Sequence, residues 1–418
     1  MKYFRLWVLT IALLCLGHQA NAQRLSLIAG GDVEWSRVTY QPDVYHDNPN
    51  PSEGEWRQVP YLNSPNTRSF LREEYTRVLD DTSLSHHKYA IHYDLSFDSD
   101  REMVRYPFRE IASYLREGDL TFVNLETPLS NDGRWQGAFR TPEVFAEGIY
   151  WAGIDVVSMA NNHALDAGGE GLMDTMGALD RVGVEKVGAG TNLEDATEPV
   201  ILERNGITVA FLAYTAFENS GTSSFAQPDR TAPRDGFERF EESSEREKYL
   251  KPSRSGVAPM DPFLIERNID DVRDEVDHVV VSLHWNIENS QETHPGARKL
   301  AKRIVDMGAD AILGHHPHVP RGIEVYKGSP IFYSIGNFIF GHNHDYWMDN
   351  YLARIDFSPD RIEDIKIRPV AGEGQDLSQP YLLEDERAEE ILEDVRNLTE
   401  KLDTNMKIRD NAGIIEIN

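Results

Sequence analysis

Three histidines follow an apolar run within one short segment of this chain. The run at 309–313 predicts a buried strand, and His315, His316 and His318 come directly after it. Histidine is the side chain that most often binds metals, and the spacing of His316 and His318 lets a chain leaving a strand present both rings to one side. The segment therefore predicts a metal site, and it leaves open which two of the three histidines bind.

Four more apolar runs end in side chains of the kinds that bind metals. The residues concerned are Asp32 after the run 25–31, Asn124 and Glu126 after 120–123, Asn162 and His163 after 155–160, and His284 after 279–283. Taken singly, such residues are more often turn, cap or hydrogen-bonded core residues. Because ligands of open α/β sheets bind at the carboxyl ends of the strands, five such ends together predict one shared site.

Six segments, in order along the chain, resemble the motifs of the CapA-type capsule-synthesis family. They are Gly31-Asp32-Val33, the segment 124–129, the segment 160–168, Ser282-Leu283-His284-Trp285, the segment 314–319 and the segment 333–338. The resemblance extends from about Leu25 to Phe340. That family is tied to poly-γ-glutamate capsules and has a calcineurin-like metallophosphoesterase architecture. The resemblance therefore implies an α/β fold, a β-sandwich flanked by helices in four layers (αββα).

The resemblance also implies roles for individual residues. The implied metal ligands are Asp32, Glu126 as the bridging acid, Asn162, His284, His316 and His318. His163 would protonate the leaving group, and Arg140 would hold an anionic substrate, although a guanidinium in such an acidic protein also fits a surface ion pair. The implied rim of the site comprises Asn124, Glu34, His315 and Asn337.

Two departures from the metallophosphoesterase pattern concern the metal ligands. Glu34 stands where that pattern has a histidine, and Asn-Leu-Glu at 124–126 replaces the common Gly-Asp. Cys15 is the only cysteine, so oxygen and nitrogen atoms must hold any metal. We therefore expect one or two divalent ions, and Mn, Fe, Zn and Mg all suit this ligand set.

The N-terminal segment has the layout of a cleavable secretory signal. Lys2 and Arg5 precede the apolar stretch 6–16, and Ala20-Asn21-Ala22 then offers a cleavage site. The apolar stretch is much shorter than the ~20 residues that span a bilayer. We therefore expect residues 1–22 to be removed, and a secreted or periplasmic protein with no stable membrane anchor.

The charge of the chain limits its partners. The formal net charge is −28, and it becomes two units more negative once Lys2 and Arg5 are removed. Such a surface repels nucleic acid and anionic lipid. An anionic substrate would therefore need a local cationic patch, which a metal centre can supply.

Helices and strands are expected to alternate through one large domain at 23–345. Helices are predicted at 106–117, 142–152, 169–182, 259–276 and 295–307, with strands at 120–124, 155–159 and 206–214. The segment 34–103 reads as a long insertion, and 217–256 as either a lid or a solvated loop. The tail at 346–418 is expected to complete the same domain with strands and a helix at 384–402.

Two functions are compatible with these residues. The first is an exported metal-dependent hydrolase, similar to metallophosphoesterases, that acts on a phosphoester or on an anionic polymer such as poly-γ-glutamate. The second is a non-catalytic component of the capsule-assembly machinery that binds or transfers the polymer in the same cleft. The ligand set favours catalysis, and the family resemblance favours a role in capsule synthesis.

Overall fold

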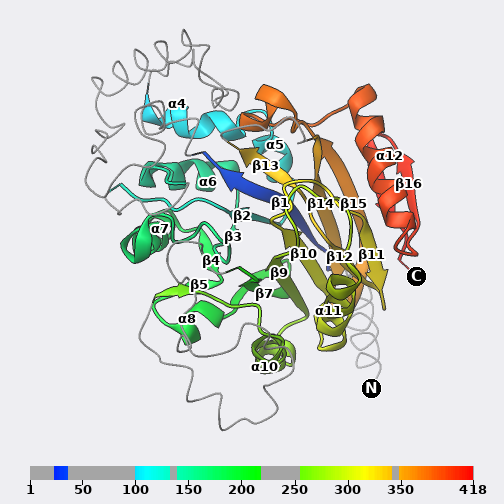
Figure 1. Ribbon diagram of the computed structural model, residues 1–418, viewed down its shortest axis with the longest axis horizontal. Coiled ribbons are helices and arrows are strands. Elements are labelled where there is room, and N and C mark those ends of the chain that lie inside the picture. The colour runs from blue at the N-terminus through cyan, green and yellow to red at the C-terminus, as the bar shows by residue number, and fades with distance from the viewer. Residues whose placement is uncertain (1–22, 36–98, 132–138, 218–254, 341–347, 418) are drawn as a thin grey trace, which may run out of the picture.

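The fold is a sandwich of two β-sheets with helices on the outer faces. The structure is a computed structural model, and it describes residues 23–35, 99–131, 139–217, 255–340 and 348–417. Figure 1 shows the two sheets at the centre, with α6 and α7 beside one sheet and α10 and α11 beside the other. The predicted four-layer αββα arrangement is thereby confirmed. The predicted signal at 1–22, most of the insertion and most of 217–256 lie outside the described residues.

The first sheet holds the strands that begin and end the described chain. Among the described residues its order is β16-β17-β15-β14-β1-β2-β3-β4, and β13 also pairs with β1. Strands β1 to β4 are parallel, and β14 runs antiparallel to β1. The bounds are β1 (Leu25–Glu34), β2 (Leu120–Leu125), β3 (Val156–Ser158), β4 (Glu185–Val187), β13 (Asn337–Phe340), β14 (Asn350–Ser358), β15 (Arg361–Val370), β16 (Met406–Arg409) and β17 (Ala412–Ile415).

The second sheet has the order β11-β12-β10-β9-β7-β6 within the described part of the chain. Strands β7, β9, β10 and β12 are parallel, and β6 and β11 pair antiparallel at the edges. The bounds are β6 (Val200–Arg204), β7 (Ile207–Thr215), β9 (His278–His284), β10 (Ala311–His315), β11 (Ile323–Tyr326) and β12 (Ser329–Phe332). A separate two-stranded ladder pairs β5 (Ala189–Gly190) with β8 (Gly256–Val257).

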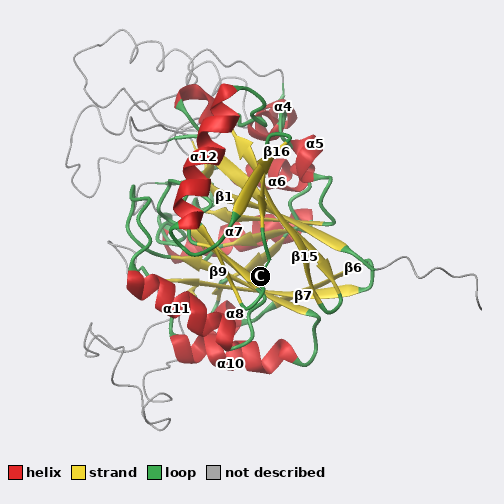
Figure 2. Cartoon of the chain, turned by 90° about the vertical axis from the view of Figure 1, so that its right-hand side faces the viewer, coloured by secondary structure: helices red, strands yellow, loops and turns green. Residues whose placement is uncertain are grey.

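Three apolar clusters hold the four layers together. One cluster packs β1, β2 and β3 against α4 to α7, a second fills the space between the sheets, and a third packs the second sheet against α10 and α11. Figure 2 shows α10 and α11 on the outer side of the second sheet and α12 beside β16. The helices are α4 (Asp100–Arg105), α5 (Ala112–Leu115), α6 (Ala146–Ala152), α7 (Gly168–Val182), α8 (Leu193–Thr197), α10 (Pro262–Arg273), α11 (Pro295–Asp306) and α12 (Glu386–Glu400).

The C-terminal tail is built into the first sheet. Strand β14 lies beside the first half of β1, and β15 and β17 extend the sheet away from it. Ile391, Leu392 and Val395 of α12 are buried in the cluster between the sheets. The tail therefore adds strands to the first sheet and buried side chains to the cluster between the sheets.

The single helix predicted at 106–117 is not present; two short helical elements take its place. The structure has a 3-10 turn at Tyr106–Phe108 and a short α5 at Ala112–Leu115. Tyr106, Pro107 and Phe108 are all buried in succession, which a single helical face cannot achieve. The remaining predicted helices are present with shifted ends; α10, for example, begins at Pro262, after Asp261 accepts a hydrogen bond from the backbone of Phe263 at 2.8 Å.

Strand β1 changes its neighbour halfway along. Its first half pairs with β14, and its last residues pair with β13. The register of its pairing with β2 shifts between Ala29 and Asp32. At this shift a Cβ on Gly31 would lie 1.9 Å from the carbonyl oxygen of Gly336. Glycine at 31 therefore allows the two backbones to touch, and Asp32 donates its N–H to Gly336 at 3.0 Å.

The predicted insertion at 34–103 has ends that belong to the core. Glu34 is the last residue of β1, Trp35 is fully buried, and α4 begins at Asp100. Trp35 packs against the rings of Phe108 and Phe145, with centroids 5.5 and 5.3 Å apart. Residues 36–98 lie outside the described residues.

Candidate metal centre

The carboxyl ends of parallel strands from both sheets meet at one place. Asp32 of β1 lies in register with Asn124 of β2 on one side and with Asn337 of β13 on the other. In the second sheet His315 of β10 lies in register with His284 of β9. The strand ends predicted to share a site are therefore brought to the same level of the sandwich.

One group of candidate ligands combines both sheets. Glu126 follows β2, Asn162 follows β3, His284 ends β9, and His316 follows β10. Nε2 of His284 lies 2.8 Å from Oδ1 of Asn162, 3.1 Å from Nδ1 of His316 and 3.5 Å from Oε1 of Glu126. Glu126, His284 and His316 are all buried and converge closely enough to hold one metal ion.

A second group shares Glu126 with the first. It comprises Asp32, Glu126 and His318, which are also buried. His318 lies with Nδ1 3.4 Å from Oδ2 of Asp32 and with Nε2 3.8 Å from Oε1 of Glu126. Glu126 is thus common to both groups.

The surroundings of the Glu126 carboxylate favour a bound cation. It is fully buried, and neither oxygen accepts a hydrogen bond from any residue that the structure describes. Burial, together with the negative charges of Asp32, Glu288 and Glu34, raises the pKa of Glu126 well above its usual range. An unpartnered buried carboxylate is costly, and a divalent cation would remove that cost. The residues present therefore fit a metal.

Asp32 is held as an anion by its surroundings. Burial by itself raises its pKa, but His315, His318 and Asn124 lower the pKa of Asp32 on balance. Its oxygens accept hydrogen bonds from Nδ2 of Asn124 at 2.9 Å and from the backbone N–H of His316 at 3.2 Å. These hydrogen bonds fix the direction of the carboxylate before any ligand binds.

The histidines of the first group are neutral. Burial and neighbouring histidines lower the pKa of His284 well below its usual range, and burial lowers the pKa of His316 to about 3. A neutral imidazole keeps a lone pair for a metal. His316 and His318 also have φ angles of 94° and 59°, in the left-handed region that L residues rarely adopt. Such backbone is maintained only where the surroundings enforce it.

His163 forms a pair with a residue to which the sequence motifs assigned no role. Its Nδ1 lies 2.7 Å from Oδ2 of Asp166, which is buried and also accepts the N–H of Phe139 at 2.8 Å. The Phe139 ring lies 4.2 Å from the His163 ring, and Oδ1 of Asn161 accepts the N–H of His163 at 3.1 Å. The spacing of three residues between His163 and Asp166 was the signal in the sequence.

The predicted rim residues lie in different surroundings. Asn124 and Asn337 are buried beside the ligands, and Oδ1 of Asn337 lies 2.9 Å from Nδ1 of His318. Glu34 is fully buried. His315 still belongs to β10, where its Nδ1 lies 3.4 Å from Asp32, and it is in none of the candidate metal groups formed by the described residues. Arg140 is half-buried and follows Phe139 in the chain.

Two residues near the centre were not predicted from the sequence. Glu288 forms a third candidate metal group with His316 and His318. The ring of Phe217 packs 4.0 Å from that of His316. Both residues follow strands of the second sheet by only a few positions, and neither has a motif of its own in the sequence.

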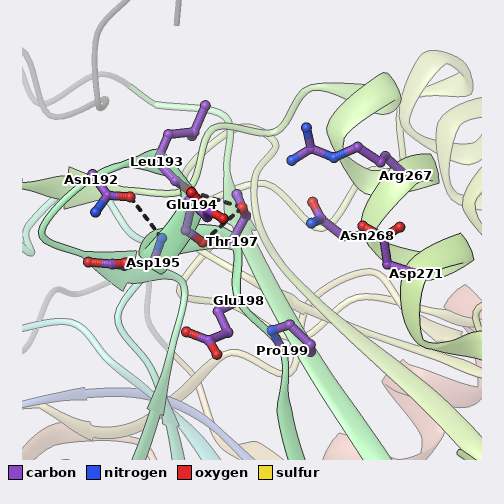
Figure 3. A pocket seen from close by; sticks show the side chains of 10 residues that line it. All are labelled: Asn192, Leu193, Glu194, Asp195, Thr197, Glu198, Pro199, Arg267, Asn268 and Asp271. Atoms are coloured by element: carbon purple, nitrogen blue, oxygen red, sulfur yellow. Dashed lines mark hydrogen bonds between the residues drawn. The ribbon is translucent and has the colours of Figure 1, made fainter. Parts of the chain in front are cut away.

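A separate cavity of about 680 Å³ lies between α8 and α10, and no residue of the metal centre lines it. Figure 3 shows Glu194, Asp195 and Glu198 on one side of this cavity, with Arg267 and Asp271 on the other. The surplus of acidic side chains disfavours an anionic ligand there. No residue predicted from the sequence to be functional lines this cavity.

Two relatives of this chain are named as capsule or PGA biosynthesis proteins. The chain is 29% identical over 269 residues to the "PGA biosynthesis protein CapA" of Bacillus subtilis (strain 168), covering 63% of this chain and 64% of the relative. It is 31% identical over 287 residues to the "Capsule biosynthesis protein CapA" of Bacillus anthracis, covering 63% of each. The chain thus spans a little under two thirds of the length of these relatives.

Solved structures with a similar arrangement include a calcineurin-like phosphoesterase. YfkN from Bacillus subtilis is 13% identical with a TM-score of 0.37, covering 91% of this chain and 94% of that one. A putative 5'-nucleotidase from Staphylococcus aureus is 12% identical with a TM-score of 0.40, covering 91% of this chain and 58% of that one. The αββα fold itself is established by the sheet topology of this chain.

The family assignment follows from the sequence match. Residues 27–342 match the family described as "Bacterial capsule synthesis protein PGA_cap". The matched range contains every predicted metal ligand and both predicted catalytic residues, His163 and Arg140. In the described part of the chain, no helix has the length and apolar character needed to cross a membrane. This chain belongs to the bacterial capsule synthesis protein PGA_cap family.

Proposed function

We propose that this chain is an exported, metal-dependent hydrolase of the phosphoesterase type that acts in capsule synthesis. The observation that carries the proposal is Glu126, a fully buried carboxylate without a hydrogen bond from the described residues, placed between two groups of candidate ligands. Its substrate would be a phosphoester or an anionic polymer such as poly-γ-glutamate. The surplus negative charge of the chain makes a cationic centre necessary for either substrate.

The proposed ligands are Asp32, Glu126, Asn162, His284, His316 and His318. When bound, one or two divalent ions would activate a water molecule and neutralise charge on the substrate. Mn, Fe, Zn and Mg all suit these oxygen and nitrogen ligands. Asn124 and Asn337 orient the ligands, because Asn124 donates to Asp32 at 2.9 Å and Asn337 contacts His318 at 2.9 Å.

The proposed acid is His163, which delivers a proton from Nε2 to the leaving-group oxygen. Asp166 accepts the Nδ1–H of the ring, so the acid is the doubly protonated imidazole, whose second proton lies on Nε2, the nitrogen directed away from Asp166. Packing against Phe139 restricts rotation of the ring. Arg140, the next residue along the chain, is proposed to hold the anionic part of the substrate.

A second function is favoured by one observation. Glu34 adds a third fully buried acid beside Asp32 and Glu126, where the metallophosphoesterase pattern has a histidine. An added carboxylate makes the ligand set harder and changes the metal preference. The alternative is therefore a component of the capsule-assembly machinery that binds or transfers the polymer without hydrolysing it.

The site of action is proposed to be outside the cytoplasmic membrane. The support is the N-terminal pattern of Lys2, Arg5, an apolar stretch and Ala20-Asn21-Ala22. Expression of the full chain in a bacterial host, with N-terminal sequencing of the exported product, tests this proposal. A product that begins at Gln23 supports it, and a product that retains Met1 contradicts it.

Elemental analysis of the purified mature protein is the first test of the function. It is paired with hydrolysis assays of a chromogenic phosphoester and of poly-γ-glutamate after metal reconstitution. Stoichiometric metal with turnover supports the hydrolase. Stoichiometric metal with polymer binding but without turnover supports the alternative, and a protein that binds no divalent metal contradicts both. Asp32→Ala and His316→Ala should remove metal and turnover while the circular dichroism spectrum is retained.

A further inference from the structure

The His316 ring has two nitrogen atoms that face different surroundings. Nδ1 lies 3.1 Å from Nε2 of His284 and so faces the first group of candidate ligands. Nε2 lies on the other side of the ring, 3.7 Å from Oε1 of Glu288. A neutral imidazole carries its proton on one nitrogen only, so Nδ1 can bind a metal only while the proton is on Nε2. The tautomer of His316 therefore decides whether this ligand is available.

We propose that Glu288 is a positioning residue that accepts the Nε2–H of His316 and so keeps Nδ1 free for the metal. This inference rests on the proposed metal centre. A carboxylate on the distal nitrogen of a metal-binding histidine is a common device that fixes both tautomer and ring orientation. Glu288 is 53% exposed, so a small side-chain rotation can shorten the 3.7 Å separation to a hydrogen bond.

The loop that carries Glu288 is fixed to the histidine loop by backbone hydrogen bonds. Trp285 donates its N–H to the carbonyl of His315 at 3.1 Å, and Asn289 donates its N–H to that of Pro317 at 2.8 Å. Asn286 and Asn289 have φ angles of 77° and 57°, so the loop curls tightly on both sides of Glu288. These hydrogen bonds hold Glu288 at a fixed place relative to His316.

Arg321 also fixes the loop that carries Glu288. Its guanidinium is buried, with Nε donating to the carbonyl of Ser290 at 2.7 Å and an Nη donating to that of Ile287 at 3.0 Å. These two carbonyls flank Glu288 in the chain. The Phe217 ring packs 4.0 Å from that of His316 and restricts its rotation. Arg321 therefore fixes the backbone on both sides of Glu288.

The test compares Glu288→Leu with Glu292→Leu in the full mature protein. Glu292 is an exposed acid in the same segment, so its replacement removes the same charge without removing the acceptor at His316. Cobalt(II) binding is measured by titration calorimetry, which gives stoichiometry and affinity. The His316 tautomer is read from ¹⁵N shifts in metal-free, histidine-labelled protein, using His316→Gln to assign the resonance.

We expect Glu288→Leu to lower cobalt affinity about 10- to 100-fold at unchanged stoichiometry and to move the His316 proton to Nδ1. Glu288→Gln, which keeps an acceptor oxygen, should retain most of the affinity, and Glu292→Leu should change it less than twofold. Unchanged affinity and tautomer in Glu288→Leu would overturn the inference while leaving the metal centre in place. Loss of a bound ion would overturn it too, because Glu288 would then be a direct ligand.

Wild-type protein that binds no cobalt would overturn the proposed function and this inference together. A variant of Arg321 provides a second, independent test. Arg321→Gln should weaken cobalt binding, and the double variant with Glu288→Leu should be no weaker than Glu288→Leu alone, because both changes act on one contact. Additive losses would show that Arg321 acts by another route and contradict its assigned role.

Discussion

Oδ1 of Asn162 lies 2.8 Å from Nε2 of His284, and the two residues come from different sheets. Asn162 follows β3 of the first sheet, and His284 ends β9 of the second. The candidate metal centre therefore spans the interface between the sheets. Metal binding should consequently couple to the stability of the whole sandwich.

Asn162→Leu should remove one ligand and with it most of the stabilisation by metal. A ligand at 100 times its Kd stabilises the native state by about 2.7 kcal/mol. Thermal unfolding with excess Mn²⁺ and with EDTA measures this difference, which should be large in the wild type and small in the variant. Asn405→Leu, at an exposed position far along the chain, is the control and should respond to Mn²⁺ as the wild type does.

Asp166→Asn should lower turnover of a chromogenic phosphoester without loss of bound metal. The expected reduction in kcat is about 10²-fold, since general acid catalysis contributes about 10²- to 10⁴-fold and the ring itself remains. Asp174→Asn removes a carboxylate on α7 that accepts a hydrogen bond from Ser130, and it should leave kcat unchanged. Equal kcat values for Asp166→Asn and the wild type would exclude the proposed role of the His163–Asp166 pair.

Glu126→Gln should stabilise the metal-free protein at neutral pH while abolishing metal binding. The folded state raises the pKa of Glu126, so ionisation favours the unfolded state once the pH exceeds the usual glutamate range. Each pH unit above that range, up to the folded pKa, costs the wild type about 1.4 kcal/mol, and the variant lacks this cost.

Urea unfolding in EDTA at several pH values tests this behaviour. The stability advantage of Glu126→Gln over the wild type should grow as the pH rises above the usual glutamate range, and it should be smallest below that range, where both states of the wild type hold the proton. Glu170→Gln, an exposed replacement on α7, should show no such growth. A wild type that is more stable than Glu126→Gln at pH 7 in EDTA would contradict the claim that burial of the Glu126 carboxylate costs stability.

Gly31→Ala should destabilise the fold by about 3 kcal/mol or more, because its Cβ would lie 1.9 Å from the backbone oxygen of Gly336. The displaced backbone would also lengthen the hydrogen bond from Asp32 to Gly336. Gly183 is the control, because its φ is 78° and no described atom lies within 4 Å of the place that a methyl group would take there. Gly183→Ala should cost only about 1 kcal/mol in urea unfolding, from backbone strain alone.

The amino-acid sequence by itself determined the positions of the main strands along the chain and the ligand types at their ends. The apolar run 279–283 lies within β9, and the run 309–313 overlaps the first part of β10, which begins two residues later than predicted, at Ala311. A strand buried between two layers must be apolar on both faces. A parallel sheet places such strand ends at one edge. Asp32, Glu126 and His284 could therefore be assigned to one site before the fold was known.

The tertiary structure decided which histidines face the centre and what supports them. His315 remains in β10 beneath Asp32, whereas the backbone turn at His316, with φ of 94°, directs the next rings toward Glu126. Glu288 was missed because its relation to His316 depends on hydrogen bonds between two loops. Periodicity and composition report contacts along one element, but the distance between two loops follows from how the sheets pack, and that information is spread over the whole chain.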